Sequence, residues 1–166
     1  MERELAQIIN EMIVFDSGDI KRINHFMKVY AYASAIAALE DVSERTRQII
    51  EVTAVLHDIG IKVCEKKYGR CGGDLQEKEG PPLARNLLNR LGMYDIDFVD
   101  RVCYLIGRHH TYSAISGIDF QILVEADLLV NMEEDQVNLS EVRHIEKSLF
   151  QTEAGIAFLQ NMFYEQ

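Results

Sequence analysis

The residues that most strongly interrupt helices are concentrated in one stretch of this chain. There are only two prolines, Pro81 and Pro82, and six of the ten glycines lie between Gly60 and Gly92. Outside that stretch, apolar residues recur at the spacing of a helix face and do not alternate as in a strand. The sequence therefore predicts an all-α fold, a compact bundle of about six to eight helices with one irregular central loop.

The apolar spacing also places the individual helices. The run at 120–130 is almost entirely apolar, which predicts a central helix buried on most sides; a strand is the alternative there, but the flanking chain is helical. Residues 62–79 lose the pattern and are expected to form the irregular loop, with the two prolines in the first turn of the next helix. The expected helices are about 2–15, 20–39, 44–59 after an N-cap at Ser43, 81–91 before Gly92, one from Asp95 or Asp97 to about His109, 120–130, and a C-terminal segment from Ser140.

The size and charge of the chain limit its organisation and its partners. At 166 residues it falls within the roughly 100–200 residues of one domain, so residues 1–166 are expected to form a single unit with its own core. Seventeen Lys and Arg against 27 Asp and Glu give a formal charge of −10, which disfavours broad nucleic-acid binding. Small anions are not excluded, because a bound metal ion can reverse the local charge.

Cysteine usage and hydropathy indicate the compartment. Cys64, Cys71 and Cys103 are odd in number and form no CxxC pair, so neither a disulfide framework nor a structural zinc site is indicated. No window approaches the roughly 18 consecutive apolar residues of a membrane span, and the N-terminus lacks the pattern of an export signal. We expect a cytoplasmic protein with reduced thiols and no membrane contact.

Several ionisable side chains stand next to apolar helical stretches. Asp127 lies inside the apolar run at 120–130, and His25, His57 and His109 each adjoin apolar helix residues. A salt bridge or helix cap would explain Asp127, and hydrogen bonding within the core would explain each histidine. A metal ion would explain all four together, because its charge offsets the cost of burying them. Imidazole and carboxylate ligands suit Mn, Fe, Zn and related ions.

The order of these groups resembles the HD superfamily of metal-dependent phosphohydrolases, whose signature is H…HD…D on an all-helical scaffold. The matching residues are His25, the segment LHDIG at 56–60, IGRHH at 106–110 and EAD at 125–127. The resemblance covers about residues 20–135 and leaves 140–166 as C-terminal covering helices. It implies that His25, His57, Asp58 and Asp127 hold a divalent transition metal (Mn, Fe, Zn, Ni or Co).

Members of that superfamily with two metals extend the comparison. Their His-His segment supplies further ligands and the Asp of the HD pair bridges both ions, which makes His109 and His110 candidate ligands here. Such members carry a histidine where this chain has Gln76, ahead of Gly80, and often a lysine directly after HDIG, where Lys62 is displaced by one place. One ion is therefore the first expectation and two the alternative.

The resemblance implies hydrolysis of a nucleotide or another small phosphate ester by a metal-activated water, with Asp58, His109 and His110 as catalytic residues. Lys62, Arg70 and Arg108 are candidate phosphate clamps, although a solvated surface charge is the first interpretation of each. Glu77 and Glu79 could activate water or contact a nucleotide, or they could form the first polar turn of a helix. The full set of candidate substrate-binding residues is Lys62, Arg70, Gln76, Glu77, Glu79, Arg108 and Tyr112.

Two other functions remain open at this stage. One is a di-iron oxygenase on the same scaffold, which needs two irons. The other is a non-catalytic module in which a bound metal or nucleotide stabilises the helices for signalling. Self-association is compatible with either function, and no symmetry is indicated.

Overall fold

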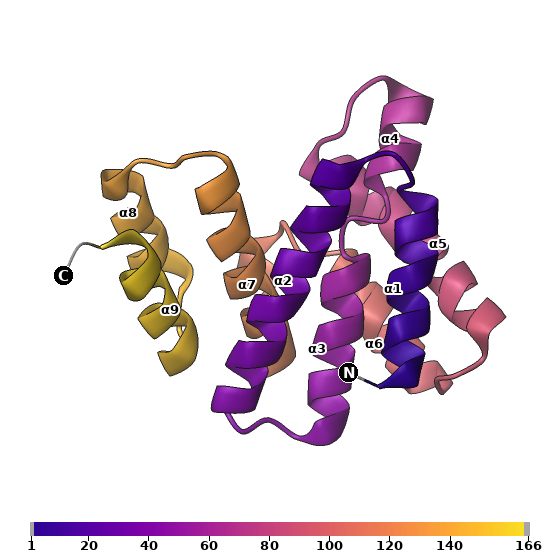
Figure 1. The fold of residues 1–166 in the computed structure, drawn as a ribbon, viewed down its shortest axis with the longest axis horizontal. Coiled ribbons are helices and arrows are strands. Elements are labelled where there is room, and N and C mark those ends of the chain that lie inside the picture. The colour runs from indigo at the N-terminus through magenta and orange to yellow at the C-terminus, as the bar shows by residue number, and fades with distance from the viewer. Residues whose placement is uncertain (1, 165–166) are drawn as a thin grey trace.

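The structure is a computed structural model that describes residues 2–164, and within that range its regular elements are all helical (Figure 1). The predicted all-α fold is confirmed. None of the helices between residues 2 and 164 is long and apolar enough to cross a membrane. The elements are α1 (Arg3–Phe15), α2 (Ile20–Leu39), α3 (Glu44–Leu56), α4 (Ile61–Tyr68), α5 (Gly73–Leu91), α6 (Ile96–Ile106), the 3-10 helix η1 (Tyr112–Ala114), α7 (Ile118–Glu134), α8 (Leu139–Leu149) and α9 (Glu153–Phe163).

Short polar side chains define where many of these helices begin. In five helices the side chain of the residue before the first turn accepts a hydrogen bond from the backbone N–H three residues later, which satisfies a donor that the helix itself cannot pair. These N-caps are Asp19, Ser43, Asp95, Asn138 and Thr152. The expected cap at Ser43 is confirmed, and Asp95 is the cap chosen at α6.

The core is organised around α3 and α7. Helix α3 packs against α1, α2, α6 and α7, and α2 also packs along α7 (Figure 1). Residues 119–130 of α7 are all buried, as expected for a central helix whose surface is apolar on nearly all sides. This arrangement brings one segment of α2, the end of α3 and the middle of α7 to a common point inside the protein.

The prediction of an irregular loop over 62–79 is wrong. Residues 61–68 form α4 and α5 begins at Gly73, so only 69–72 lie between them, and the two prolines lie in the middle of α5 and not in its first turn. The physical reason is that buried residues keep helical spacing on both sides of the prolines, so that packing outweighs two missing N–H donors. The buried residues of α5 are Leu75, Gly80, Ala84, Leu87 and Leu88.

Helix α5 approaches the turn after α3 very closely. A Cβ atom placed on Gly60 would lie 3.0 Å from the backbone nitrogen of Gly80 and 3.1 Å from the carbonyl oxygen of Gln76. Only glycine permits this backbone contact. The contact fixes α5 beside the 57–60 turn, where α3 was expected to continue but in fact ends at Leu56.

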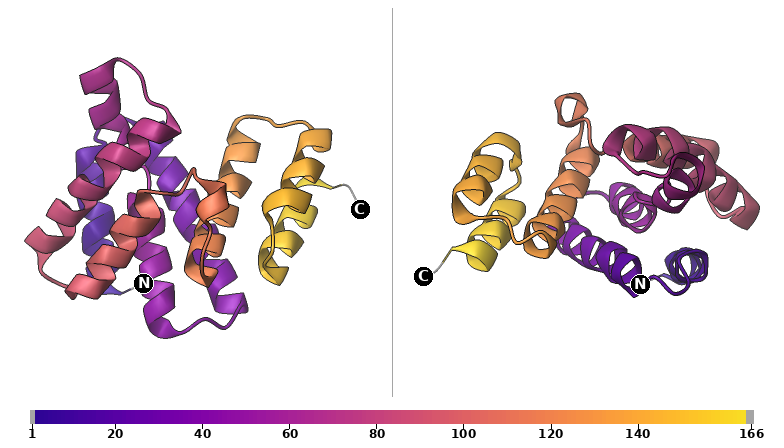
Figure 2. Two further views of the ribbon diagram at one scale, coloured as in Figure 1. Left: turned by 180° about the vertical axis from the view of Figure 1, so that it is seen from behind. Right: turned by 90° about the horizontal axis from the view of Figure 1, so that it is seen from above.

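Helices α8 and α9 form a pair that packs on α7 and α2 at one end of the molecule (Figure 2). The fully buried carboxylate of Glu125 in α7 anchors their connection. It accepts hydrogen bonds from the backbone N–H groups of Gln151 (2.6 Å) and Thr152 (3.0 Å), from the Thr152 hydroxyl and from Nε2 of Gln121 (2.7 Å). The expected C-terminal covering segment is thus two helices, and its last two residues, 165 and 166, lie outside the described range.

Candidate metal centre

Four donor atoms from three helical segments meet inside the protein. His25 lies in the second turn of α2, His57 and Asp58 directly follow α3, and Asp127 lies in the middle of α7. His25 Nε2 is 3.3 Å from His57 Nε2, 3.3 Å from Asp127 Oδ1 and 3.5 Å from Asp58 Oδ2. His57 Nε2 is 3.4 Å from Asp127 Oδ1 and 3.5 Å from Asp58 Oδ2.

The other ring nitrogen of each histidine is held by an acceptor. Nδ1 of His57 is 2.8 Å from the carbonyl oxygen of Ala54, and Nδ1 of His25 is 2.9 Å from Oε2 of Glu134. A carbonyl oxygen can only accept, so Nδ1 of His57 carries the hydrogen and Nε2 of the neutral ring presents its lone pair to the cluster. Nδ1 of His25 carries its hydrogen for the same reason, because the ionised carboxylate of Glu134 can only accept.

These distances fit one transition-metal ion. Ligand atoms about 2.0–2.1 Å from an ion stand about 2.8–3.0 Å from their neighbours in octahedral geometry and about 3.3–3.4 Å in tetrahedral geometry, and the separations given above are close to the tetrahedral values. While both imidazole rings are neutral, Asp127 Oδ1 is buried without a hydrogen-bond partner among the described residues, because the nearby Nε2 atoms of His25 and His57 donate only when they are protonated. A cation at this point would satisfy the orphaned oxygen.

The pKa shifts of the clustered groups also favour a positive charge at this point. Burial disfavours a charge on His57, but Asp58 and Asp127 outweigh it and raise its pKa to about 9. Burial likewise opposes a charge on His25, yet its hydrogen bond with Asp127 gives a raised pKa. Burial would raise the pKa of Asp127, but hydrogen bonds from His25 and His57 hold it well below its usual range. The cluster is therefore built to hold positive charge.

The two adjacent histidines lie beside this cluster. Nε2 of His109 is buried, has no hydrogen-bond partner among residues 2–164, and lies 3.7 Å from Oδ1 of Asp58. Asp58, His109 and His110 offer ligand atoms that all lie within 4.8 Å of one another, a second group that shares Asp58 with the first. Burial and the neighbouring His109 lower the pKa of His110, which favours its neutral form.

Gln76 and Glu77, at the start of α5, contact the histidine pair in different ways. Oε1 of Gln76 lies 2.9 Å from Nε2 of His110, and Gln76 lines the cavity at the cluster. The Glu77 carboxylate accepts hydrogen bonds from the backbone N–H of His110 (3.0 Å) and the hydroxyl of Thr111 (2.9 Å). Glu77 thus fixes the turn that carries His110 and does not itself line the cavity.

The other candidate substrate-binding residues are not brought to the cluster. Lys62 and Glu79 lie elsewhere because the segment that was expected to fold as a loop over the site is helical, and Arg70, Arg108 and Tyr112 also have other surroundings. Lys62 donates to the carbonyl oxygen of Phe15, Arg70 pairs with Asp74 at the surface, Glu79 accepts from Lys67 and Tyr68, Arg108 lies over the Tyr104 ring, and Tyr112 lines a different cavity.

A cavity of about 300 Å³ opens at the cluster, and about half of its lining was missed by the sequence reasoning. Helical spacing could have identified most of the missed lining residues. Asn131 and Glu134 follow Asp127 by four and seven residues and so share its helix face. Lys21 and Arg22 precede His25 by four and three residues and share the face of His25 in the same way. The lining residues that were missed are Asp19, Lys21, Arg22, Ile61, Asn131 and Glu134.

Comparison with known proteins agrees with this geometry. The model of the HD domain family matches residues 22–146. A crystal structure described as a predicted HD superfamily hydrolase from an uncultured Thermotogales bacterium is 28% identical, covers 96% of this chain and 83% of its own, and superposes with a TM-score of 0.65. No curated protein matches the sequence. The chain belongs to the HD domain family.

Proposed function

We propose that this protein is a metal-dependent hydrolase that cleaves the phosphate ester bond of a small phosphorylated molecule, with residues 1–166 acting as a single HD-type domain. The observation that carries the proposal is the convergence of His25, His57, Asp58 and Asp127. The Nε2 atoms of the two histidines lie 3.3–3.5 Å from each other and from one carboxylate oxygen of each aspartate. Four ionisable groups from three helical segments would be costly to bury together without a cation.

These four residues would hold a divalent ion such as Mn, Fe, Zn, Ni or Co. When bound, such an ion polarises a phosphoryl oxygen and lowers the pKa of water. The two carboxylates balance the charge of the ion, and the Nδ1 hydrogen bonds of His25 and His57 keep both rings oriented with Nε2 inward. Asp58 turns one oxygen toward His25 and His57 and the other toward His109, so a second ion would share it.

The rim of the cavity supplies recognition of an anion. Lys21 and Arg22 line it from the first turn of α2, and Arg22 is oriented by Glu65 at 2.8 Å and Asp19 at 3.5 Å. These two cations take the place of the clamps expected from the sequence. They would attract the phosphate group locally although the chain carries a formal charge of −10.

The remaining lining residues would orient the substrate. His110, held by Gln76 at 2.9 Å and by Glu77 through its backbone N–H, would position the phosphate or accept a proton from the attacking water. Asn131 offers an amide to the leaving group from α7. A cavity of about 300 Å³ is at the small end of ligand sites, which favours a mononucleotide or a smaller ester over a polymer.

The proposal is tested by elemental analysis of the purified protein together with a hydrolysis screen. Phosphate release would be measured over a panel of nucleotides and sugar phosphates with Mn²⁺, Co²⁺ or Ni²⁺. We expect near-stoichiometric metal, and we expect Asp58→Asn and His25→Ala to lose both the metal and the activity. His144→Ala is the matched control, because His144 is exposed on α8.

Wild-type protein that binds no metal and releases no phosphate from any ester would overturn the proposal. Two irons per chain with oxygen consumption and no phosphate release would replace it with the oxygenase alternative. Metal binding without turnover of any compound would favour a signalling module.

A further inference from the structure

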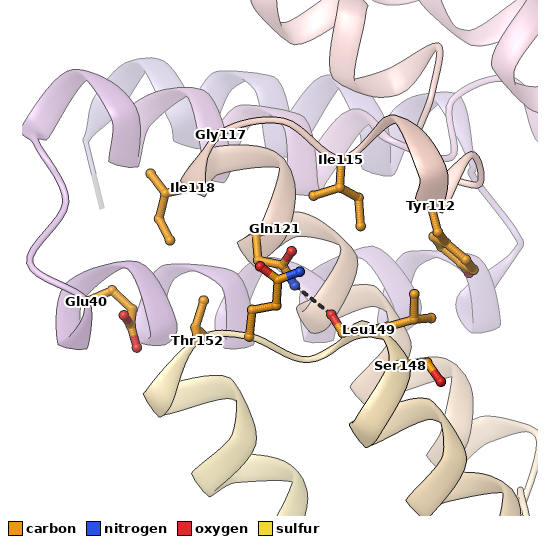
Figure 3. A pocket seen from close by; sticks show the side chains of 10 residues that line it. Glu40, Tyr112, Ile115, Gly117, Ile118, Gln121, Ser148, Leu149 and Thr152 are labelled. Atoms are coloured by element: carbon orange, nitrogen blue, oxygen red, sulfur yellow. Dashed lines mark hydrogen bonds between the residues drawn. The ribbon is translucent and has the colours of Figure 1, made fainter.

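A second cavity lies away from the metal cluster and shares none of its lining residues. It has a volume of about 430 Å³ and is bounded by η1, the start of α7, the connection between α8 and α9, and the end of α2 (Figure 3). The proposed hydrolysis makes no use of it. Its lining residues are Glu40, Tyr112, Ile115, Gly117, Ile118, Gln121, Ser148, Leu149, Gln151 and Thr152.

Gln121 gives this cavity an unpaired hydrogen-bond acceptor. Its side chain is 4% exposed, and its Nε2 donates to Oε1 of Glu125 and to the carbonyl oxygen of Leu149, both at 2.7 Å. Both partners can only accept, so the amide cannot be reversed without losing two hydrogen bonds. Its Oε1 is therefore fixed as the free end, and it has no hydrogen-bond partner among the residues that the structure describes. A buried acceptor left in this state is costly unless a donor reaches it.

The charge around the cavity favours a cation. No lysine, arginine or histidine lines it, whereas Glu40 stands at its edge and the Glu125 carboxylate lies behind Gln121. The backbone N–H groups at the start of α9 do not offer an anion site, because Ala154 donates to Glu40 at 2.8 Å and Thr152 donates to Glu125. The lining thus carries one carboxylate and no basic side chain, together with the free oxygen of Gln121.

The cavity also has an apolar part. Ile115, Ile118 and Leu149 contribute aliphatic side chains, and Tyr112 contributes a ring that is 37% exposed. Figure 3 shows Glu40 and Tyr112 at opposite ends of the cavity with Gln121 between them. A ligand that spans it would place a donor group between Glu40 and Gln121 and an apolar group toward Tyr112.

We propose that this cavity is a binding site for a small organic ammonium ion that carries an apolar group. The ammonium N–H groups would donate to Gln121 Oε1 and to the Glu40 carboxylate, which supply a buried neutral acceptor and a nearby negative charge. The apolar group would pack on Leu149, Ile115 and the Tyr112 ring at the other end of the cavity. The proposal is independent of the hydrolase function, because no residue of the metal cluster takes part.

The test is titration calorimetry of the full chain with three probes of similar size. These are 2-phenylethylammonium, the neutral 2-phenylethanol and the anionic 3-phenylpropionate. We expect the ammonium to bind at least about tenfold more tightly than the alcohol, which corresponds to about one charge-assisted hydrogen bond, and the carboxylate not to bind. Backbone amide NMR shifts on binding should centre on Tyr112, Ile115 and Gln121.

Two variants and one control locate the site. Glu40→Gln keeps an oxygen that can accept from the Ala154 N–H but removes the charge, and should weaken ammonium binding about fivefold or more. Ile118→Trp, at a position that is 41% exposed, should fill the cavity and abolish binding. Val14→Trp on α1, also exposed, is the control and should bind as the wild type does.

Circular dichroism and thermal unfolding must first show that each variant is folded. The proposal is overturned if the ammonium does not bind, if the alcohol or the carboxylate binds equally well, or if Ile118→Trp binds the ammonium like the wild type.

Discussion

Glu134 is the side chain whose replacement tests the design of the metal centre most directly, because it touches a proposed ligand without being one. Its Oε2 accepts from His25 Nδ1 at 2.9 Å, and Lys28 holds its Oε1 at 2.7 Å. Burial would raise the pKa of Glu134, but the hydrogen bonds from Lys28 and His25 lower it, so the group is ionised near neutral pH. An anionic acceptor fixes the His25 ring and makes its Nε2 a stronger ligand.

The size of the effect follows from the hydrogen bond. A bond to a charged group contributes about 1.5–3 kcal/mol and a neutral one about 0.5–1.5 kcal/mol. Glu134→Gln keeps an acceptor and loses the charge, a difference of about 1 kcal/mol or about fivefold in ion affinity. Glu134→Ala removes the whole contact and should cost about ten- to a hundredfold.

The assay is calorimetric titration of metal-free protein with Mn²⁺. Glu133→Ala is the matched control, because Glu133 also binds Lys28 at 2.8 Å but is 58% exposed and does not contact His25. Thermal unfolding of the metal-free variants separates loss of affinity from loss of fold. Wild-type affinity in Glu134→Ala, or the same loss in Glu133→Ala, would refute the reasoning.

Three further predictions concern the fold and the cluster. Gly60→Ala should push α5 away from the 57–60 turn, because the new Cβ would lie 3.0 Å from the Gly80 nitrogen. This overpacking should cost about 1–3 kcal/mol and lower the Tm by several degrees, and an unchanged Tm would contradict the prediction. Thr152→Val removes the N-cap of α9 and the hydroxyl donor to buried Glu125, and should lower the free energy of unfolding in urea by about 1–3 kcal/mol; an unchanged urea midpoint would count against that anchoring. Because the pKa of His57 is raised to about 9, protonation stabilises the metal-free fold below pH 6.5, and this contribution is lost as the pH rises through about 9. Ion binding must displace that proton, so the affinity for the ion should increase as the pH rises through the same range. Calorimetry in two buffers of different ionisation enthalpy should show the released proton, and an affinity that does not change with pH would contradict the prediction.

Much of the fold could be predicted because it depends on local pattern. The helices at 3–15, 20–39 and 96–106 follow the apolar spacing and the caps at Asp19 and Asp95. The central loop was predicted wrongly because the prolines were treated as a boundary. In the folded protein, burial of one face of α5 outweighs the donors that the prolines lack.

The candidate site, like the fold, could be predicted from the sequence only in part. A carboxylate amid apolar residues, as at Asp127, requires a partner wherever it is buried, so the sequence alone singled it out. The cations Lys62, Arg70 and Arg108 could not be placed in this way, because an exposed flexible side chain goes where its nearest partner lies, and those partners are set by packing.

The sequence by itself determined most of the helices outside residues 61–80 and the order of the imidazole and carboxylate groups along the chain, because spacing and capping act within a few residues. Only the tertiary structure decided that donors 32 and 70 residues apart share one point, that Glu134 orients His25, and that Lys21 and Arg22 face the cavity. Those outcomes depend on how α2, α3 and α7 are rotated and packed against each other, and this is fixed by the burial of all three in one core.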